Sequence, residues 1–127
     1  MGFFYISDDP APERGACDAD VVVLIAGGEI DYAAAPQLRE RMARHVESGA
    51  RRMVLDFSQV TFIDSTAIGV LIGTGTRLQR TRGGSLTVIC GKENTRVLRI
   101  LDISGIDSLF ELEYSREDAF SALATAG

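Results

Sequence analysis

The chain has 127 residues, of which 46% are hydrophobic, so it can bury one core but would be crowded as two domains. Its formal net charge of −5 at pH 7 argues against a broad surface for nucleic acid or anionic membrane, since both need clustered Lys and Arg. Cys17 and Cys90 form neither a metal-binding spacing nor a disulfide framework, so we expect reduced thiols and no metal.

The first residues lack the basic start and the long apolar stretch of a signal peptide. No apolar segment approaches the ~20 residues that a membrane span requires. We therefore expect a cytoplasmic protein that is not attached to a membrane. Residues 1–20 are expected to form an edge strand and a polar loop, and residues 21–123 the core of a single domain over 1–127.

Apolar runs alternate with amphipathic segments along the chain. Strands are predicted at 3–7, 21–26, 53–57, 85–90 and 107–111, and a short apolar segment follows the third of them at 61–63. Helices are predicted at 33–47, 65–81 and 93–101 and from Ser115 onward. This alternation favours an α/β fold with right-handed crossovers. We expect a mixed, mostly parallel sheet of about five strands with about four helices, the N-terminal edge strand being antiparallel.

Three glycines lie inside the predicted helix 65–81, although each costs about 1 kcal/mol relative to alanine. Gly69 and Gly73 are four residues apart and share a face, which predicts a close approach of this helix to the sheet or to a neighbouring helix. The alternative is mobility at a surface that contacts a partner. Near the end of the helix, Arg77 and Arg80 complement its dipole or contact an acidic partner.

Ser65 falls in the opening turn of that helix, directly after a buried strand. The first N–H groups of a helix have no internal partners and carry the positive end of its dipole, so a phosphate on Ser65 would be favoured there. The alternative is that Asp64 or Ser65 merely caps the helix. A phosphoserine carries about −1.5 to −2 charges, and beside Asp64 and Asp31 it would enter a negative surface and weaken binding to a partner.

Loops that bind ligands or partners gather at the carboxyl ends of strands in sheets of this kind. Asp31 follows one predicted strand and Asp64 follows the next, so we expect their loops to be neighbours. We predict a partner surface there, in which Tyr32 and Ile68 give apolar contact. Its residues are Asp31, Tyr32, Asp64, Ser65, Thr66, Ala67 and Ile68.

Several segments resemble, in the same order along the chain, those of STAS domains, in particular the bacterial anti-sigma factor antagonists. The signature segment is FIDSTAIG at 62–69. The other matching segments are GEID at 28–31, VLDFS at 54–58, and the glycine pair at 83–84 with LDISGI at 101–106. The resemblance runs from about residue 21 to residue 123 and implies a single STAS domain.

The resemblance implies that Ser65 is phosphorylated by a partner that is both an anti-sigma factor and an ATP-binding serine kinase, with Thr66 as a secondary candidate. The unphosphorylated form would bind this kinase and release the sigma factor, and a serine phosphatase would reset Ser65. The chain itself would then be no enzyme, hold no cofactor, and be a monomer when free. Ala67 departs from the family pattern, since many members have glycine there, and its methyl group is expected to limit the approach of the kinase.

Two other classes of function remain. A phospho-aspartate receiver with Asp56 as acceptor needs a lysine after its last parallel strand, and the sole lysine is Lys92. The other class is a non-switching STAS scaffold in a transporter or sensor complex, or one that binds a nucleotide, although the glycine-rich phosphate cradle is lacking. A serine hydrolase has no evident base for Ser65, because the sole histidine, His45, is expected on a helix surface.

Overall fold

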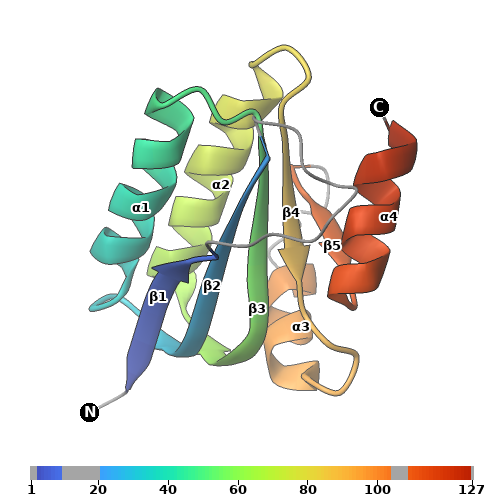
Figure 1. Cartoon of the computed structure of the whole chain (residues 1–127). Helices are drawn as coiled ribbons and strands as arrows, with labels where there is room; N and C mark the ends of the chain where they lie inside the picture. The colour runs from blue at the N-terminus through green and yellow to red at the C-terminus, as the bar shows by residue number, and fades with distance from the viewer. Residues whose placement is uncertain (1–2, 10–20, 104–108, 127) are drawn as a thin grey trace.

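A five-stranded sheet organises the chain in the computed structural model, which describes residues 3–9, 21–103 and 109–126 (Figure 1). Its strands, in spatial order, are β1 (Phe4–Asp8), β2 (Val21–Ile30), β3 (Arg52–Ile63), β4 (Ser85–Ile89) and β5 (Glu111–Glu113). β1 pairs antiparallel with β2, and all other pairs are parallel. The predicted mixed α/β sheet with an antiparallel N-terminal edge strand is confirmed.

Three helices connect the parallel strands, and a fourth follows β5. They are α1 (Ala35–Glu47), α2 (Ser65–Gln79), α3 (Thr95–Ile103) and α4 (Arg116–Ala126). α1 and α2 lie side by side on one face of the sheet, and both begin at the edge where β2 and β3 end (Figure 1). None of the helices in the described part of the chain is long and apolar enough to span a membrane.

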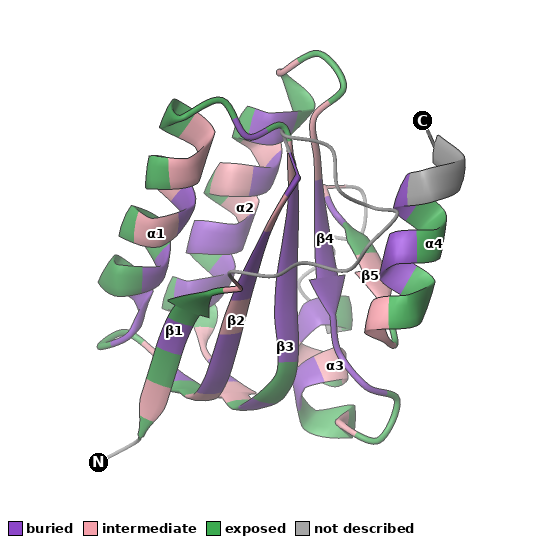
Figure 2. Ribbon diagram, viewed as in Figure 1, coloured by how far each residue is buried: buried purple, intermediate pink, exposed green. Residues whose placement is uncertain are grey.

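Two apolar clusters cover the two faces of the sheet. The larger joins the inner sides of α1, α2 and α3 to the strands, as with Leu38, Leu71 and Val97. The smaller packs Phe120 and Leu123 of α4 against the opposite face. Buried residues therefore run along β3 and β4 (Figure 2), as expected for parallel strands that are covered on both sides.

β2 and β3 are longer than predicted. β3 runs without a break from Arg52 to Ile63, whereas two separate segments, at 53–57 and 61–63, were predicted. The register with β2 shifts twice along this length, so β3 takes up the extra residues as bulges. β2 continues through Gly27 and Gly28 to Ile30 because β1 pairs with both glycines.

Several other boundaries were predicted closely. The final helix begins after Ser115, whose Oγ accepts a hydrogen bond from Asp118 N at 3.1 Å, so the predicted cap is confirmed. Gly49 has a φ of 101° and ends α1 as expected. The last strand lies at Glu111–Glu113 rather than at 107–111, and residues 107–108 of that prediction are outside the described residues, as are residues 104–106 of the segment 101–106.

The prediction for Gly69 and Gly73 was wrong. A Cβ atom added at either position would meet no other atom within 4 Å, and both residues are exposed. Gly75 is the glycine of α2 with a close neighbour, since a Cβ there would lie 2.9 Å from the carbonyl oxygen of Leu109. Helical spacing identified a shared face but not which way that face pointed.

Candidate functional site

The loops after β2 and β3 leave the sheet side by side. Ile30 and Ile63 are register partners and the last residues of their strands. Asp31 and Asp64 follow them directly, so the two carboxylates leave the same edge of the sheet, as expected. This edge is also where α1 and α2 begin (Figure 1).

Asp64 is the N-cap of α2. It has extended backbone angles, and its Oδ1 accepts a hydrogen bond from Ala67 N at 3.0 Å. Its carbonyl oxygen accepts the next bond, from Ile68 N at 3.0 Å. Of the two capping alternatives, Asp64 therefore caps the helix, and Ser65 is its first residue.

Ser65 and Thr66 are both exposed at the start of α2. Their N–H groups belong to the first turn of a 15-residue helix, where no intrahelical acceptor exists. A group attached to the Ser65 hydroxyl would thus stand in solvent, near the positive end of the helix dipole. This arrangement can accept a phosphate without disturbing the core.

Asp31 has a matching role before α1. Its Oδ1 accepts hydrogen bonds from Ala33 N at 3.0 Å and Ala34 N at 3.3 Å, which hold the turn that leads into the helix. Tyr32, at the tip of this turn, is 72% exposed. The loop therefore offers one carboxylate and one aromatic ring at the surface.

Ala67 and Ile68 lie beneath this surface, with 1% and 6% of their area exposed. Both belong to the core because the first turn of α2 rotates these positions towards the sheet. The expectation that Ile68 gives direct apolar contact to a partner was therefore wrong. Among the residues predicted for the partner surface, Tyr32 has the exposed apolar side chain. The methyl group of Ala67 also faces inward and does not stand between Ser65 and an approaching protein.

Asp56 lies within β3, hydrogen-bonds the local backbone and is part of an ionic network. Its Oδ1 accepts hydrogen bonds from Ser58 N at 3.0 Å and Ser58 Oγ at 2.6 Å, and its Oδ2 lies 2.8 Å from Arg116 Nε. Arg116 also contacts Asp9, with 2.8 Å between Nη1 and Oδ2. Burial alone would raise the pKa of Asp56, but the hydrogen bonds from Ser58 and Arg116 and the Arg116 charge lower it overall.

This network disfavours a receiver function, because both Asp56 oxygens already have partners. Sequence inspection missed it, since Asp9, Asp56 and Arg116 are far apart along the chain. A basic residue at the start of a helix, where cations are unfavourable, was the one local signal that Arg116 had a partner.

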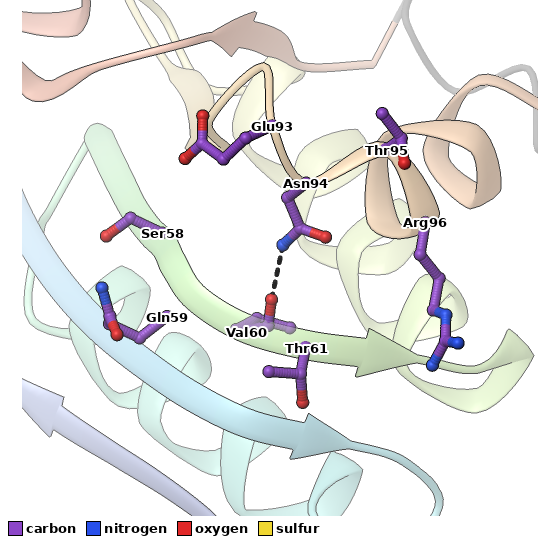
Figure 3. Close-up of a pocket in the computed structure, with 8 residues that line it drawn as sticks. All are labelled: Ser58, Gln59, Val60, Thr61, Glu93, Asn94, Thr95 and Arg96. Carbon is purple, nitrogen blue, oxygen red and sulfur yellow. Dashed lines mark hydrogen bonds between the residues drawn. The ribbon is translucent and has the colours of Figure 1, made fainter.

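A pocket of about 430 Å³ lies beside β3, where the pairing with β4 has ended at Asp56. It is lined by residues 58–61 of β3 and residues 93–96 at the start of α3 (Figure 3). Asn94 Nδ2 donates a hydrogen bond to the carbonyl oxygen of Val60 at 2.6 Å. This side chain therefore pairs with the edge of β3 beyond the point where β4 ends. The sequence offered no signal for this pocket.

Thiol and metal chemistry find little support in the described residues. Cys90 is buried, and burial followed by the charge of Glu93 raises the pKa of its thiol to about 11, so it serves as a core residue. Within residues 3–9, 21–103 and 109–126, no group of three or more His, Cys, Asp or Glu side chains could hold a metal ion.

Comparison with known proteins places this arrangement in a family. The STAS domain family matches residues 16–119. The anti-sigma-B factor antagonist of Bacillus subtilis is 36% identical over 98 residues, which cover 77% of this chain and 85% of that protein.

Solved structures share the fold. An anti-sigma factor antagonist from Mycobacterium paratuberculosis superposes with a TM-score of 0.79 at 24% identity, over 95% of this chain and 94% of that one. The Bacillus cell fate determinant SpoIIAA in its phosphorylated form gives a TM-score of 0.65 at 19% identity, over 94% and 99% of the two chains. The family match over most of the chain and the 36% identical relative show that this protein belongs to the STAS domain family, beside relatives that are anti-sigma factor antagonists.

Proposed function

We propose that this protein is an anti-sigma factor antagonist that switches partners through Ser65. Its unphosphorylated form binds an anti-sigma factor that is also an ATP-binding serine kinase, and this binding releases the sigma factor. Phosphorylation of Ser65 ends the binding, and a serine phosphatase restores it. The kinase supplies ATP and magnesium, so this chain acts as its substrate and not as an enzyme, as a monomer in the cytoplasm.

The proposal is supported mainly by the position of Ser65. The hydroxyl is exposed at the first residue of α2, and Asp64 already caps the helix, so Ser65 is not needed as the cap. Asp31 and Tyr32 lie at the same edge of the sheet and would complete the contact surface. Thr66 is also exposed and is the secondary acceptor.

Charge explains why a phosphate would end the binding without unfolding the protein. A phosphoserine adds about −1.5 to −2 charges beside Asp31 and Asp64, and these charges would have to be desolvated in the complex. In the free protein the dipole of α2 stabilises the same phosphate by about 1 kcal/mol or less. The switch therefore acts at the interface, while the fold stays the same.

The first test is peptide mass spectrometry on the protein purified from its native cells with and without stress. We expect a phosphate on Ser65 whose occupancy changes with stress. A Ser65→Ala bait, which cannot be phosphorylated, should then retain an ATP-binding serine kinase that also binds a sigma factor.

The second test measures the affinity of that kinase for three variants. Ser65→Ala should bind as the wild type does, whereas Ser65→Asp should bind at least tenfold more weakly. Ser121→Asp, an identical change at an exposed position of α4 on the opposite face of the sheet, is the control and should bind normally. Absence of phosphate under every condition, together with full binding by Ser65→Asp, would instead indicate a non-switching scaffold.

A further inference from the structure

A groove of about 280 Å³ runs between α1 and α2. Arg39, Ala43 and Val46 line it from α1, and Gly69, Gly73 and Arg77 are among the residues that line it from α2. The two helices lie side by side and start from the same edge of the sheet (Figure 1), so the groove follows both of them away from Ser65. We call it the α1–α2 groove.

The fold accounts for several glycines but not for the two in this groove. Gly75 faces the carbonyl oxygen of Leu109, and Gly83 has a positive φ of 74°, so both are required where they are. Gly69 and Gly73 have open space where a side chain would be, although glycine is among the least favourable residues inside a helix. Because these two glycines have no side chains, the surface of α2 is low at their positions, and the backbone of another protein segment can come close to it.

The groove is also cationic in a protein whose net charge is −5. Arg39 is the fifth residue of α1 and Arg77 the thirteenth of α2, so these two exposed arginines line the groove from the beginning of one helix and from near the end of the other. In the described part of the chain neither forms an ion pair, whereas Arg41 and Arg44 on the same α1 helix do. The charge and the shape together favour an anionic, closely packed occupant.

We propose that the α1–α2 groove receives an acidic helix of the anti-sigma factor. The distance between packed helices depends on the side chains at their contact, so the glycines at 69 and 73 let a third helix approach α2 closely. Acidic side chains of that helix pair with Arg39 and Arg77. The inference rests on the proposed function and extends its interface, because Ser65, Gly69, Gly73 and Arg77 are four residues apart and follow one side of α2.

This docking mode also gives the phosphate a direct target. Ser65 is the first residue of α2 and precedes Gly69, the first groove residue of that helix, by four positions, or about one turn. A phosphate there repels an acidic helix that docks in the groove. Phosphorylation would thus weaken binding through repulsion between like charges, in addition to the cost of desolvation.

The test compares affinities for the purified anti-sigma factor recovered with the Ser65→Ala bait. Gly73→Leu fills the groove, and Arg77→Glu reverses its charge; each should weaken binding at least tenfold. Arg99→Glu is the control, because it makes the identical charge change at an exposed position of α3, outside the groove, and should bind within twofold of the wild type. Circular dichroism should show unchanged folding for Gly73→Leu, since its Cβ has open space.

The outcomes separate this inference from the proposed function. If Ser65→Asp loses binding while Gly73→Leu and Arg77→Glu bind as the wild type does, docking in the α1–α2 groove is contradicted. The proposed phosphorylation switch at Ser65 is then still supported. If Arg77→Glu is weakened and a Glu→Lys or Asp→Lys change in one partner helix restores its binding, the acidic helix is supported. If the wild type binds no anti-sigma factor, the proposed function fails and the groove fails with it.

Discussion

Ile30 and Ile63 face each other in register as the last residues of two neighbouring parallel strands, and both are buried to within 1% of complete burial. Because the strands end together, Asp31 and Asp64 emerge side by side, and each caps the turn or helix that follows. Apolar packing at one pair of residues thus sets the spacing of two surface loops. The candidate partner surface depends on this register.

The Asp64 cap is open to a direct stability test. Asp64→Ala removes the acceptor of the Ala67 N–H, so we expect a loss of about 1 kcal/mol in the free energy of unfolding, measured with urea. Asp64→Asn keeps an oxygen in the capping position and should stay within a few tenths of a kcal/mol of the wild type. Equal stability of Asp64→Ala and Asp64→Asn would show that the hydrogen bond contributes nothing measurable.

The glycines of α2 should respond differently to alanine. Gly69→Ala and Gly73→Ala each place a methyl group in open space, so each should raise the free energy of unfolding by about 0.5 to 1 kcal/mol. Gly75→Ala is the matched comparison within the same helix, and it should be destabilising because its Cβ would lie 2.9 Å from the Leu109 carbonyl oxygen. Urea unfolding of the three variants checks the order, and a stable Gly75→Ala would contradict the packing described for it.

The Asp56–Arg116 pair should make stability depend on pH. The pKa of Asp56 is lowered in the folded protein, so its ionised form favours folding above the unfolded value of about 3.9, and this contribution is lost as the pH falls through that value towards the folded pKa. Asp56→Asn should lower the free energy of unfolding by about 1 to 3 kcal/mol at pH 6.

Urea midpoints at pH 6 and pH 3 measure this difference. The gap between the wild type and Asp56→Asn should shrink at pH 3, because the wild type then loses the contribution of the charged carboxylate. Ser115→Ala, which removes the hydrogen-bonding cap of α4 without removing an ionisable group, is the control and should keep a constant gap. A gap for Asp56→Asn that does not change with pH would contradict the role given to the ion pair.

Tyr32 should contribute to partner binding without contributing to the fold. The side chain is 72% exposed beside Asp31, and aromatic side chains are often among the few residues that dominate an interface. Tyr32→Ala should therefore leave the urea midpoint unchanged and weaken binding to the anti-sigma factor about tenfold or more, which corresponds to about 1.4 kcal/mol.

Tyr114→Ala is the control for Tyr32→Ala. Tyr114 is 45% exposed and lies under Lys92 Nζ, which is 5.1 Å from its ring centroid, so it is an exposed tyrosine with contacts of its own. It follows β5, away from the Asp31 and Asp64 loops, and its loss should leave the affinity as it is. Equal effects of the two variants would remove Tyr32 from the proposed surface.

Local features could be predicted from the sequence because they depend on residues a few positions apart. The order of strands and helices, the Ser115 cap and the start of α2 beside Asp64 all follow from hydrophobic periodicity and capping preferences. The segment FIDSTAIG at 62–69 likewise identified the STAS family, which the comparisons confirm.

The sequence by itself therefore determined the α/β fold and placed Ser65 at the beginning of a helix. Only the tertiary structure decided that Ile68 is buried, that Gly69 and Gly73 face outward, and that Arg116 joins Asp56 to Asp9. The physical reason is that spacing fixes which residues share a face, whereas the direction of that face is set by packing against distant segments. Contacts such as Arg116 with Asp9, 107 residues apart, form only when the sheet has brought both ends of the chain together.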